Sequence, residues 1–276
     1  MKLFSYNVRP LSRIILGTAL AFSAFAAQAE FKEADKIIAG SDMTFFPYEY
    51  MDGNTPAGFD VEFLQGLAKV MGREAVMLDT RWANLIPGLQ GKRFDIINSS
   101  MYITAERVKV IDMIPYLKSG ESILVRKGSD YQPEVPEAFC GHTIGSMAGT
   151  SWLEKLENLS ENYCVKEGLE PISFRTFPTD PETTQALLSG AVEAQITDHA
   201  VATGVLKKLG NRVMVSSKTL LYPVLNGFGV NKGNSAVKEA LIEGIENFRK
   251  TSEYAELMEK YNFRAPTPED IENMMP

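Results

Sequence analysis

The sequence has little of the residue types on which common hydrolytic and zinc-dependent sites depend. It contains two cysteines and two histidines among 276 residues. Neither a G-x-S-x-G segment nor an H-E-x-x-H segment occurs in it. The first is the nucleophile turn of α/β-hydrolases, and the second is a helical zinc site. These absences argue against a hydrolase or a zinc enzyme, and we expect no cofactor and no metal.

Basic residues and long apolar runs are also scarce. The chain has 35 acidic and 28 basic residues, which gives a formal net charge of −7. Such a surface repels a phosphate backbone, so nucleic acid is not an expected partner. No segment approaches the ~20 uninterrupted apolar residues that a membrane-spanning helix needs. We therefore expect a soluble mature protein.

The first 29 residues have the pattern of a secretory signal peptide. Basic side chains come first, an apolar stretch follows, and a small-x-small site ends the segment: Lys2, Arg9, Arg13, 14–25 and Ala27-Gln28-Ala29. We expect cleavage after Ala29. Because no cysteine precedes Cys140, none stands at the cleavage site to carry a lipid. The pattern predicts a free periplasmic protein, with secretion into the medium as the alternative.

Cleavage leaves about 247 residues and removes three basic charges, so the net charge changes from −7 to −10. This length suffices for one large or two medium domains. The cysteines, Cys140 and Cys164, lie 24 positions apart in an exported chain. We expect them to form a disulfide, which stabilises by about 3 kcal/mol. A reactive or metal-binding thiol is the alternative, but the C-x-x-C spacing is missing.

Short apolar runs alternate with helical patterns, which is typical of α/β folds with largely parallel sheets. A first series of expected strands and helices comprises 37–39, 59–71, 76–78, a helix around 85–89, and 94–97. A second series comprises 143–145, 151–159, 172–177, 181–188, 194–197 and 200–209. Two similar series predict two lobes.

Strand-like segments at 121–125 and 220–225 lie where one series gives way to other material. Two amphipathic helices follow, around 237–248 and 254–261, and a polar tail after Arg264 is expected to fray. We infer that these helices return to the first lobe and that two strands cross between the lobes as hinges. The expected division is 1–29 signal peptide, 30–120 first lobe, 121–222 inserted lobe, and 223–276 return to the first lobe.

Arg107 stands where a helix should disfavour a cation. Thr104 is a good N-cap, so Arg107 would lie in the first turn, whose free N–H groups carry a partial positive charge. An anion bound there would resolve the conflict, because the guanidinium adds a bidentate fork to a ready-made anion site. An exposed Arg107 that pairs with Glu106 or with a neighbouring helix is the alternative.

Six segments carry a resemblance that covers nearly the whole mature chain. They are GSDMTFFPYEYMDGNTPAGFDVEF (40–63), WANLIPGLQGKRFD (82–95), SSMYITAER (99–107), IPY (114–116), FCGHTIGSMAGTS (139–151) and LLSGAVEAQITD (187–198). From about Ile37 to Arg264 the chain resembles family 3 extracellular solute-binding proteins, the polar amino-acid receptors of ABC importers. The resemblance implies the α/β, two-lobed periplasmic binding protein fold of type II, in which each lobe is a mixed, mostly parallel sheet flanked by helices and two hinge strands join the lobes.

The resemblance also implies a clamp for a zwitterion. Arg107 would take the α-carboxylate, with help from Thr150 and Ser151 where the turn 145–149 opens a helix. Asp198 would hold the ammonium, although a lone aspartate at a strand end is more often an N-cap. The full set of expected ligand-binding residues is Asp42, Phe45, Trp82, Ser99, Ser100, Tyr102, Arg107, Met147, Thr150, Ser151 and Asp198.

Tyr102 departs from the family pattern, which usually has a short serine or threonine hydroxyl against the ammonium. The Ser100 carbonyl and Asp198 would then share the ammonium, while Tyr102 reshapes the side-chain pocket. Phe45 and Trp82 resemble the aromatic walls of the family's pocket, and Asp42 would line the same region. Ser99 beside Ser100 points weakly to receptors of basic amino acids.

These observations predict a monomeric, non-enzymatic periplasmic receptor that binds a polar or charged amino acid, or a derivative, and delivers it to an ABC permease in the inner membrane. A cyclohexadienyl or arogenate dehydratase on the same scaffold is one alternative, although the shorter Asp198, where those enzymes have a glutamate, favours binding. A ligand-sensing partner of a membrane receptor is another.

Overall fold

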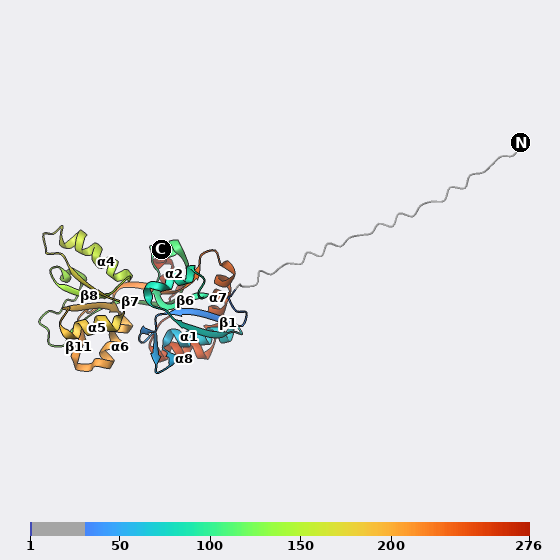
Figure 1. Ribbon diagram of the computed structural model, residues 1–276, viewed down its shortest axis with the longest axis horizontal. Coiled ribbons are helices and arrows are strands. Elements are labelled where there is room, and N and C mark those ends of the chain that lie inside the picture. Colours follow the sequence, from blue (N-terminus) through green and yellow to red (C-terminus); the bar gives the residue numbers. More distant parts are fainter. Residues whose placement is uncertain (2–30) are drawn as a thin grey trace.

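The computed structural model describes Met1 and residues 31–276 and shows two lobes (Figure 1). The predicted signal peptide and its cleavage site lie outside these residues, apart from Met1. One lobe carries α1, α2, α7, α8, β1 and β6, and the other carries α4, α5, α6, β8 and β11. In the described part of the chain, no helix combines the length and apolar character that a membrane crossing requires. The two-lobed α/β fold that the sequence predicted is confirmed.

The first lobe is built on parallel strands. β1 pairs in parallel with both β5 and β6, and a small antiparallel sheet β2-β3-β4 stands beside them. Its elements are β1 (Lys36–Ser41), β2 (Thr44–Phe45), β3 (Glu49–Asp52), β4 (Thr55–Ala57), α1 (Phe59–Val70), β5 (Glu74–Asp79), η1 (Trp82–Asn84), α2 (Leu85–Gln90), β6 (Ile96–Tyr102) and α3 (Ala105–Val110). The small sheet was not predicted, and β6 begins two residues later than the predicted strand 94–97.

The second lobe repeats this arrangement. β8 pairs in parallel with β9 and β10, and α5 packs against β8. Its elements are η2 (Pro136–Phe139), β8 (Thr143–Met147), α4 (Ser151–Leu159), η3 (Ser160–Cys164), β9 (Ser173–Phe177), α5 (Asp180–Ser189), β10 (Ala194–Asp198), α6 (His199–Leu209), η4 (Gly210–Arg212) and β11 (Val213–Val215). The predicted helix 151–159 has these bounds in the structure.

Two long antiparallel strands, β7 (Ile111–Arg126) and β12 (Leu221–Asn231), connect the lobes. β12 pairs with β6 of the first lobe, whereas β7 pairs with β10 and β11 of the second. Both strands extend well beyond the predicted segments 121–125 and 220–225. The predicted lobe boundaries, at 120/121 and 222/223, fall inside these strands, and the division itself stays a prediction.

The C-terminal helices α7 (Ser235–Phe248) and α8 (Ser252–Tyr261) pack against α1, as expected for a chain that returns to the first lobe. The prediction of a frayed tail was wrong, because residues Pro268–Met274 form the helix α9. A capping box between Thr267 and Asp270 starts this helix, and Lys118 of β7 pairs with Asp270. Capping satisfies N–H groups that a short helix would otherwise leave open.

The disulfide between Cys140 and Cys164 forms as predicted, with a Cα–Cα distance of 5.5 Å. It joins the residue that follows η2 to the end of η3, which directly continues α4. Cys164 is buried in the large apolar core together with Phe139 and Leu156. The link therefore fixes α4, whose N-terminus faces the other lobe.

Candidate functional site

Arg107 lies at the start of α3, and Thr104 caps this helix as predicted. The Thr104 side chain accepts a hydrogen bond from the Arg107 N–H at 3.2 Å. Arg107 Nη1 donates to the Tyr102 carbonyl at 2.8 Å, and Nη2 donates to the Gly149 carbonyl of the second lobe at 3.4 Å. Because a guanidinium has five N–H donors, about three remain for a ligand.

The guanidinium carries a charge that no carboxylate of the described residues neutralises at ion-pair distance. Burial lowers the pKa of Arg107 to about 10, whereas the nearby Glu154 opposes this shift. Arg107 therefore stays protonated at neutral pH. It also lies over the Trp82 ring, 5.2 Å from the centroid. The result is a half-buried cation that can take an anion.

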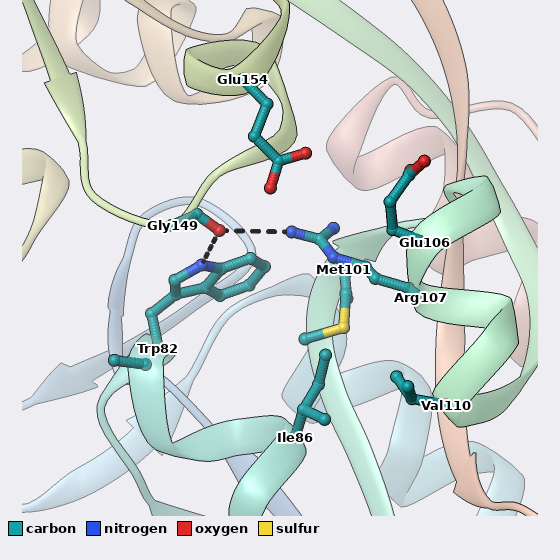
Figure 2. A pocket seen from close by; sticks show the side chains of 9 residues that line it. Trp82, Ile86, Met101, Glu106, Arg107, Val110, Gly149 and Glu154 are labelled. Atoms are coloured by element: carbon teal, nitrogen blue, oxygen red, sulfur yellow. Dashed lines mark hydrogen bonds between the residues drawn. The ribbon is translucent and has the colours of Figure 1, made fainter.

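A cavity of about 420 Å³ opens beside Arg107 between the lobes (Figure 2). Its apolar lining comes from the first lobe: Trp82, Ala83, Ile86, Met101 and Val110. Glu106 and Glu154 also line it, but both residues are exposed. A second cavity of about 480 Å³ lies on the other side of these glutamates, and Ser151, Lys155 and Tyr222 are among its lining residues. The buried Ser151 hydroxyl has no hydrogen-bond partner in the part of the chain that the structure describes.

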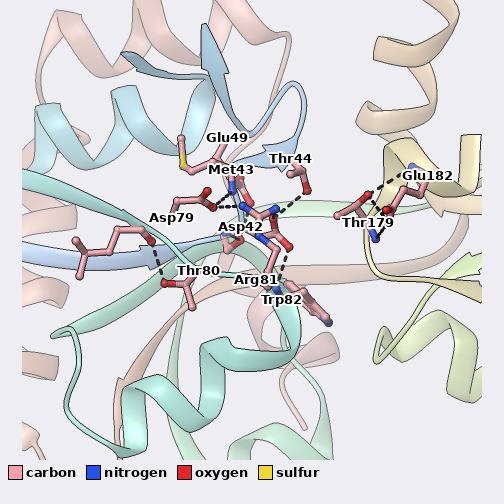
Figure 3. Close-up of polar contacts among 12 residues, drawn as sticks. Asp42, Met43, Thr44, Glu49, Asp79, Thr80, Arg81, Trp82, Thr179 and Glu182 are labelled. Atoms are coloured by element: carbon pink, nitrogen blue, oxygen red, sulfur yellow. Dashed lines mark hydrogen bonds and ion pairs between the residues drawn. The ribbon is translucent and has the colours of Figure 1, made fainter. Parts of the chain in front are cut away.

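Asp42 positions Trp82 and lines neither of these two cavities. Its carboxylate accepts the Trp82 N–H at 2.8 Å, the Thr44 hydroxyl at 2.9 Å and Arg81 Nη1 at 2.7 Å (Figure 3). Trp82 Nε1 in turn donates to the Gly149 carbonyl at 2.9 Å. Asp42 thus orients an indole that spans the cleft.

Asp198 ends β10 and caps α6, accepting the Ala200 N–H at 2.8 Å. Its Oδ1 also accepts the Tyr48 hydroxyl at 3.0 Å, and its Oδ2 accepts the hydroxyls of Ser119 at 2.6 Å and Tyr102 at 2.7 Å. The side chain is 0% exposed, and burial raises its pKa. The expected cap is present, whereas the expected ammonium role stays a prediction. Tyr48 and Ser119 were not predicted, because nothing in the sequence links them to Asp198.

The remaining predicted residues have partners of their own. Ser99 Oγ donates to Glu49 Oε1 at 2.6 Å, and both polar oxygens of Ser100 accept from the Asn226 amide. Phe45 is buried against Tyr48, with ring centroids 5.7 Å apart. Met147 is buried, and its carbonyl accepts the Thr150 hydroxyl at 2.8 Å. Three residues of the predicted set line the cavities: Trp82, Arg107 and Ser151.

Glu121 is a buried acid that the sequence analysis did not single out. It lies in β7 opposite Asp198, and Lys155 Nζ is 3.4 Å from its Oε1. Its Oε2 has no hydrogen-bond partner among Met1 and residues 31–276. Burial raises its pKa from 4.5 to about 8, against the attraction of Lys155. Between these values the folded protein binds a proton that the unfolded chain releases, so stability falls as the pH rises across this window.

We expect Glu121→Gln to remove this pH dependence, because the amide does not titrate. The variant should be more stable than the wild type at pH 8.5, and its free energy of unfolding should vary less between pH 4.5 and 8. Urea denaturation at several pH values measures both quantities, with the exposed Glu239→Gln as the control. If the substitution left the pH profile of stability unchanged, Glu121 would have to be ionised in the folded protein across this pH range.

The profile of the bacterial extracellular solute-binding proteins, family 3, matches residues 37–265. The chain belongs to this family. It is 28% identical over 232 residues to the L-cystine-binding protein TcyJ of Escherichia coli (strain K12), an alignment that covers 83% of this chain and 84% of TcyJ.

Solved structures of similar proteins have the same fold. An ancestral arginine-binding protein bound to arginine has a TM-score of 0.75 and 28% identity, over 82% of this chain and 98% of that one. The ancestral amino acid-binding protein AncCDT-1, a precursor of cyclohexadienyl dehydratase, has a TM-score of 0.70 and 29% identity, over 82% and 95% of the two chains. These relatives are described as binding proteins.

Proposed function

We propose that the protein is a monomeric periplasmic receptor that captures an amino acid or amino-acid derivative between its lobes and delivers it to an ABC permease. The observation that carries this proposal is Arg107. It is a half-buried cation without an ion-pair partner among the described residues, and it lies at a cavity between the lobes. A carboxylate is the group that its remaining donors fit.

Closure of the cleft gives such a ligand contacts with both lobes. Arg107 and Trp82 come from the first lobe, and both donate to the Gly149 carbonyl of the second. The Ser151 hydroxyl, unpaired at the start of α4, offers a further donor from the second lobe. A ligand that binds to these groups favours the closed state over the open one.

A dehydratase on this scaffold is less well supported. Such an enzyme needs a general acid that faces its substrate. Asp198 is the residue at the corresponding position, but it is fully buried and bonded to three hydroxyl groups. A carboxylate whose oxygens are taken up by these hydroxyl groups is poorly placed to exchange a proton with a substrate, so a binding protein is the better supported function.

A thermal-shift screen tests the proposed function. The screen covers the twenty amino acids, their Nα-acetyl derivatives and carboxylate-free analogues such as agmatine, which is arginine without its carboxylate. Each compound is added at about 100 times the weakest dissociation constant that the screen should detect. A ligand with that constant then adds about 2.7 kcal/mol to the free energy of unfolding. We expect stabilisation by one or more carboxylates and none by their carboxylate-free analogues. Equal stabilisation by agmatine and arginine would contradict a carboxylate anchor.

A further inference from the structure

The surroundings of Asp198 leave little room for another hydrogen-bond donor. A carboxylate offers about four acceptor sites. Oδ1 accepts from Tyr48 and the Ala200 N–H, and Oδ2 accepts from Ser119 and Tyr102, all within 3.0 Å. Every one of these donors belongs to the protein. The acid that would hold a ligand's ammonium is therefore already satisfied.

Tyr102 is the donor that fills the space beside Asp198 from the first lobe. Its ring meets the Trp152 ring edge-on, with centroids 5.3 Å apart, and the side chain is 2% exposed. Its hydroxyl also lies 3.0 Å from the Gly120 carbonyl, and its own carbonyl accepts from Arg107. The side chain cannot swing aside without loss of its hydroxyl and ring contacts. A serine at this position would leave the volume of the ring open.

The two poles of the cleft thus differ. Arg107 keeps free donors and has no counter-ion among residues 31–276, whereas protein donors occupy the acceptor sites of Asp198. An ammonium buried beside a saturated carboxylate would lose water without gaining a partner, which is costly for a charged group. A neutral amide nitrogen loses much less, because it carries no charge.

We propose that Tyr102 determines specificity by taking the place of a ligand ammonium at Asp198, so that the receptor prefers amino-acid derivatives whose α-nitrogen is acylated over the free amino acids. The inference rests on the proposed function, because it keeps the carboxylate on Arg107. An acyl group would fit against the apolar wall of the cavity that Trp82, Ile86 and Val110 form. Glu154 and Glu106 at this cavity are exposed, and water weakens any pair that they form with an ammonium.

Isothermal titration calorimetry with two ligand pairs tests this preference. The pairs are L-arginine with Nα-acetyl-L-arginine and L-glutamine with N-acetyl-L-glutamine. We expect the wild type to bind at least one acetylated compound about 10-fold more tightly than its parent. In Tyr102→Ser the ratio should shift about 100-fold toward the free amino acid, which corresponds to ~2.7 kcal/mol. Tyr102→Phe keeps the ring in place but frees one acceptor site on Asp198, so its ratio should fall between those of the wild type and Tyr102→Ser.

The exposed Tyr163→Ser makes the same substitution away from the cleft and should leave the ratio unchanged. The proposal is overturned if Tyr102→Ser gains no affinity for either free amino acid, or if the wild type binds a free amino acid more tightly than its acetylated form. If Tyr102→Ser does not fold, the wild-type ratio decides alone. Arg107→Ala separates the two claims. Binding that survives this substitution refutes the proposed function. If Arg107→Ala abolishes binding but the wild type prefers free amino acids, only the role of Tyr102 is refuted.

Discussion

Replacement of Arg107 by alanine is expected to weaken the binding of a carboxylate ligand by about 1000-fold, or ~4 kcal/mol. The guanidinium is charged at neutral pH, half-buried and free of ion pairs with the described residues, and Trp82 supports one of its faces. Without it, a ligand carboxylate would enter the cleft with no charged partner. Titration calorimetry measures the loss directly.

The unliganded protein should tolerate this substitution. Arg107 donates to two carbonyls, but its lowered pKa shows that burial opposes the charge, and these effects offset one another. Lys109→Ala removes an exposed charge from the same helix and should change the affinity by less than about 2-fold. The affinity of Arg107→Lys should fall between those of the wild type and Arg107→Ala, because an ammonium keeps the charge but lacks the planar fork of the guanidinium. Affinity within 10-fold of the wild type in Arg107→Ala would contradict the anchor.

Replacement of Asp198 by alanine is expected to destabilise the ligand-free protein by about 3 kcal/mol. The change leaves the hydroxyls of Tyr48, Tyr102 and Ser119 without their acceptor and removes the cap of α6. The loss is limited because Tyr102 keeps the Gly120 carbonyl as a partner. Urea denaturation without added ligand measures this free energy.

Asn234→Ala provides the matched control, because Asn234 caps α7 with its side chain but forms no comparable network. Loss of a cap alone costs about 1 kcal/mol. If Asp198→Ala costs no more than Asn234→Ala, the three hydroxyl bonds contribute nothing. The account would then be wrong in treating Asp198 as a carboxylate that the protein itself satisfies.

Local signals in the sequence predicted much of this fold. Thr104 as an N-cap, the helix of Ser151–Leu159 and the return of the C-terminal helices to α1 are present in the structure. Caps and apolar periodicity act over a few residues, so a single sequence reveals them. The small sheet β2-β3-β4 was missed because its strands are two to four residues long in a stretch rich in turn formers.

Long-range contacts account for the rest. Tyr48 and Ser119 reach Asp198 across 150 and 79 residues, and no local pattern announces either contact. The helix α9 was missed because its packing partners lie elsewhere in the chain: Ile271 and Met274 join the cluster around Leu85 and Phe94. The resemblance indicated that Tyr102 is unusual, but only the structure places its hydroxyl on Asp198.

The most direct test of the central claim pairs a change in the protein with a change in the ligand. The dissociation constants of wild type and Arg107→Ala are measured for the best-binding carboxylate and for its primary carboxamide. In the wild type, we expect the carboxamide to bind about 1000-fold more weakly than the carboxylate. In Arg107→Ala, the two ligands should bind within about 3-fold of each other. The difference corresponds to a coupling energy of ~4 kcal/mol between Arg107 and the carboxylate. An equal loss in both proteins would show that the carboxylate binds elsewhere.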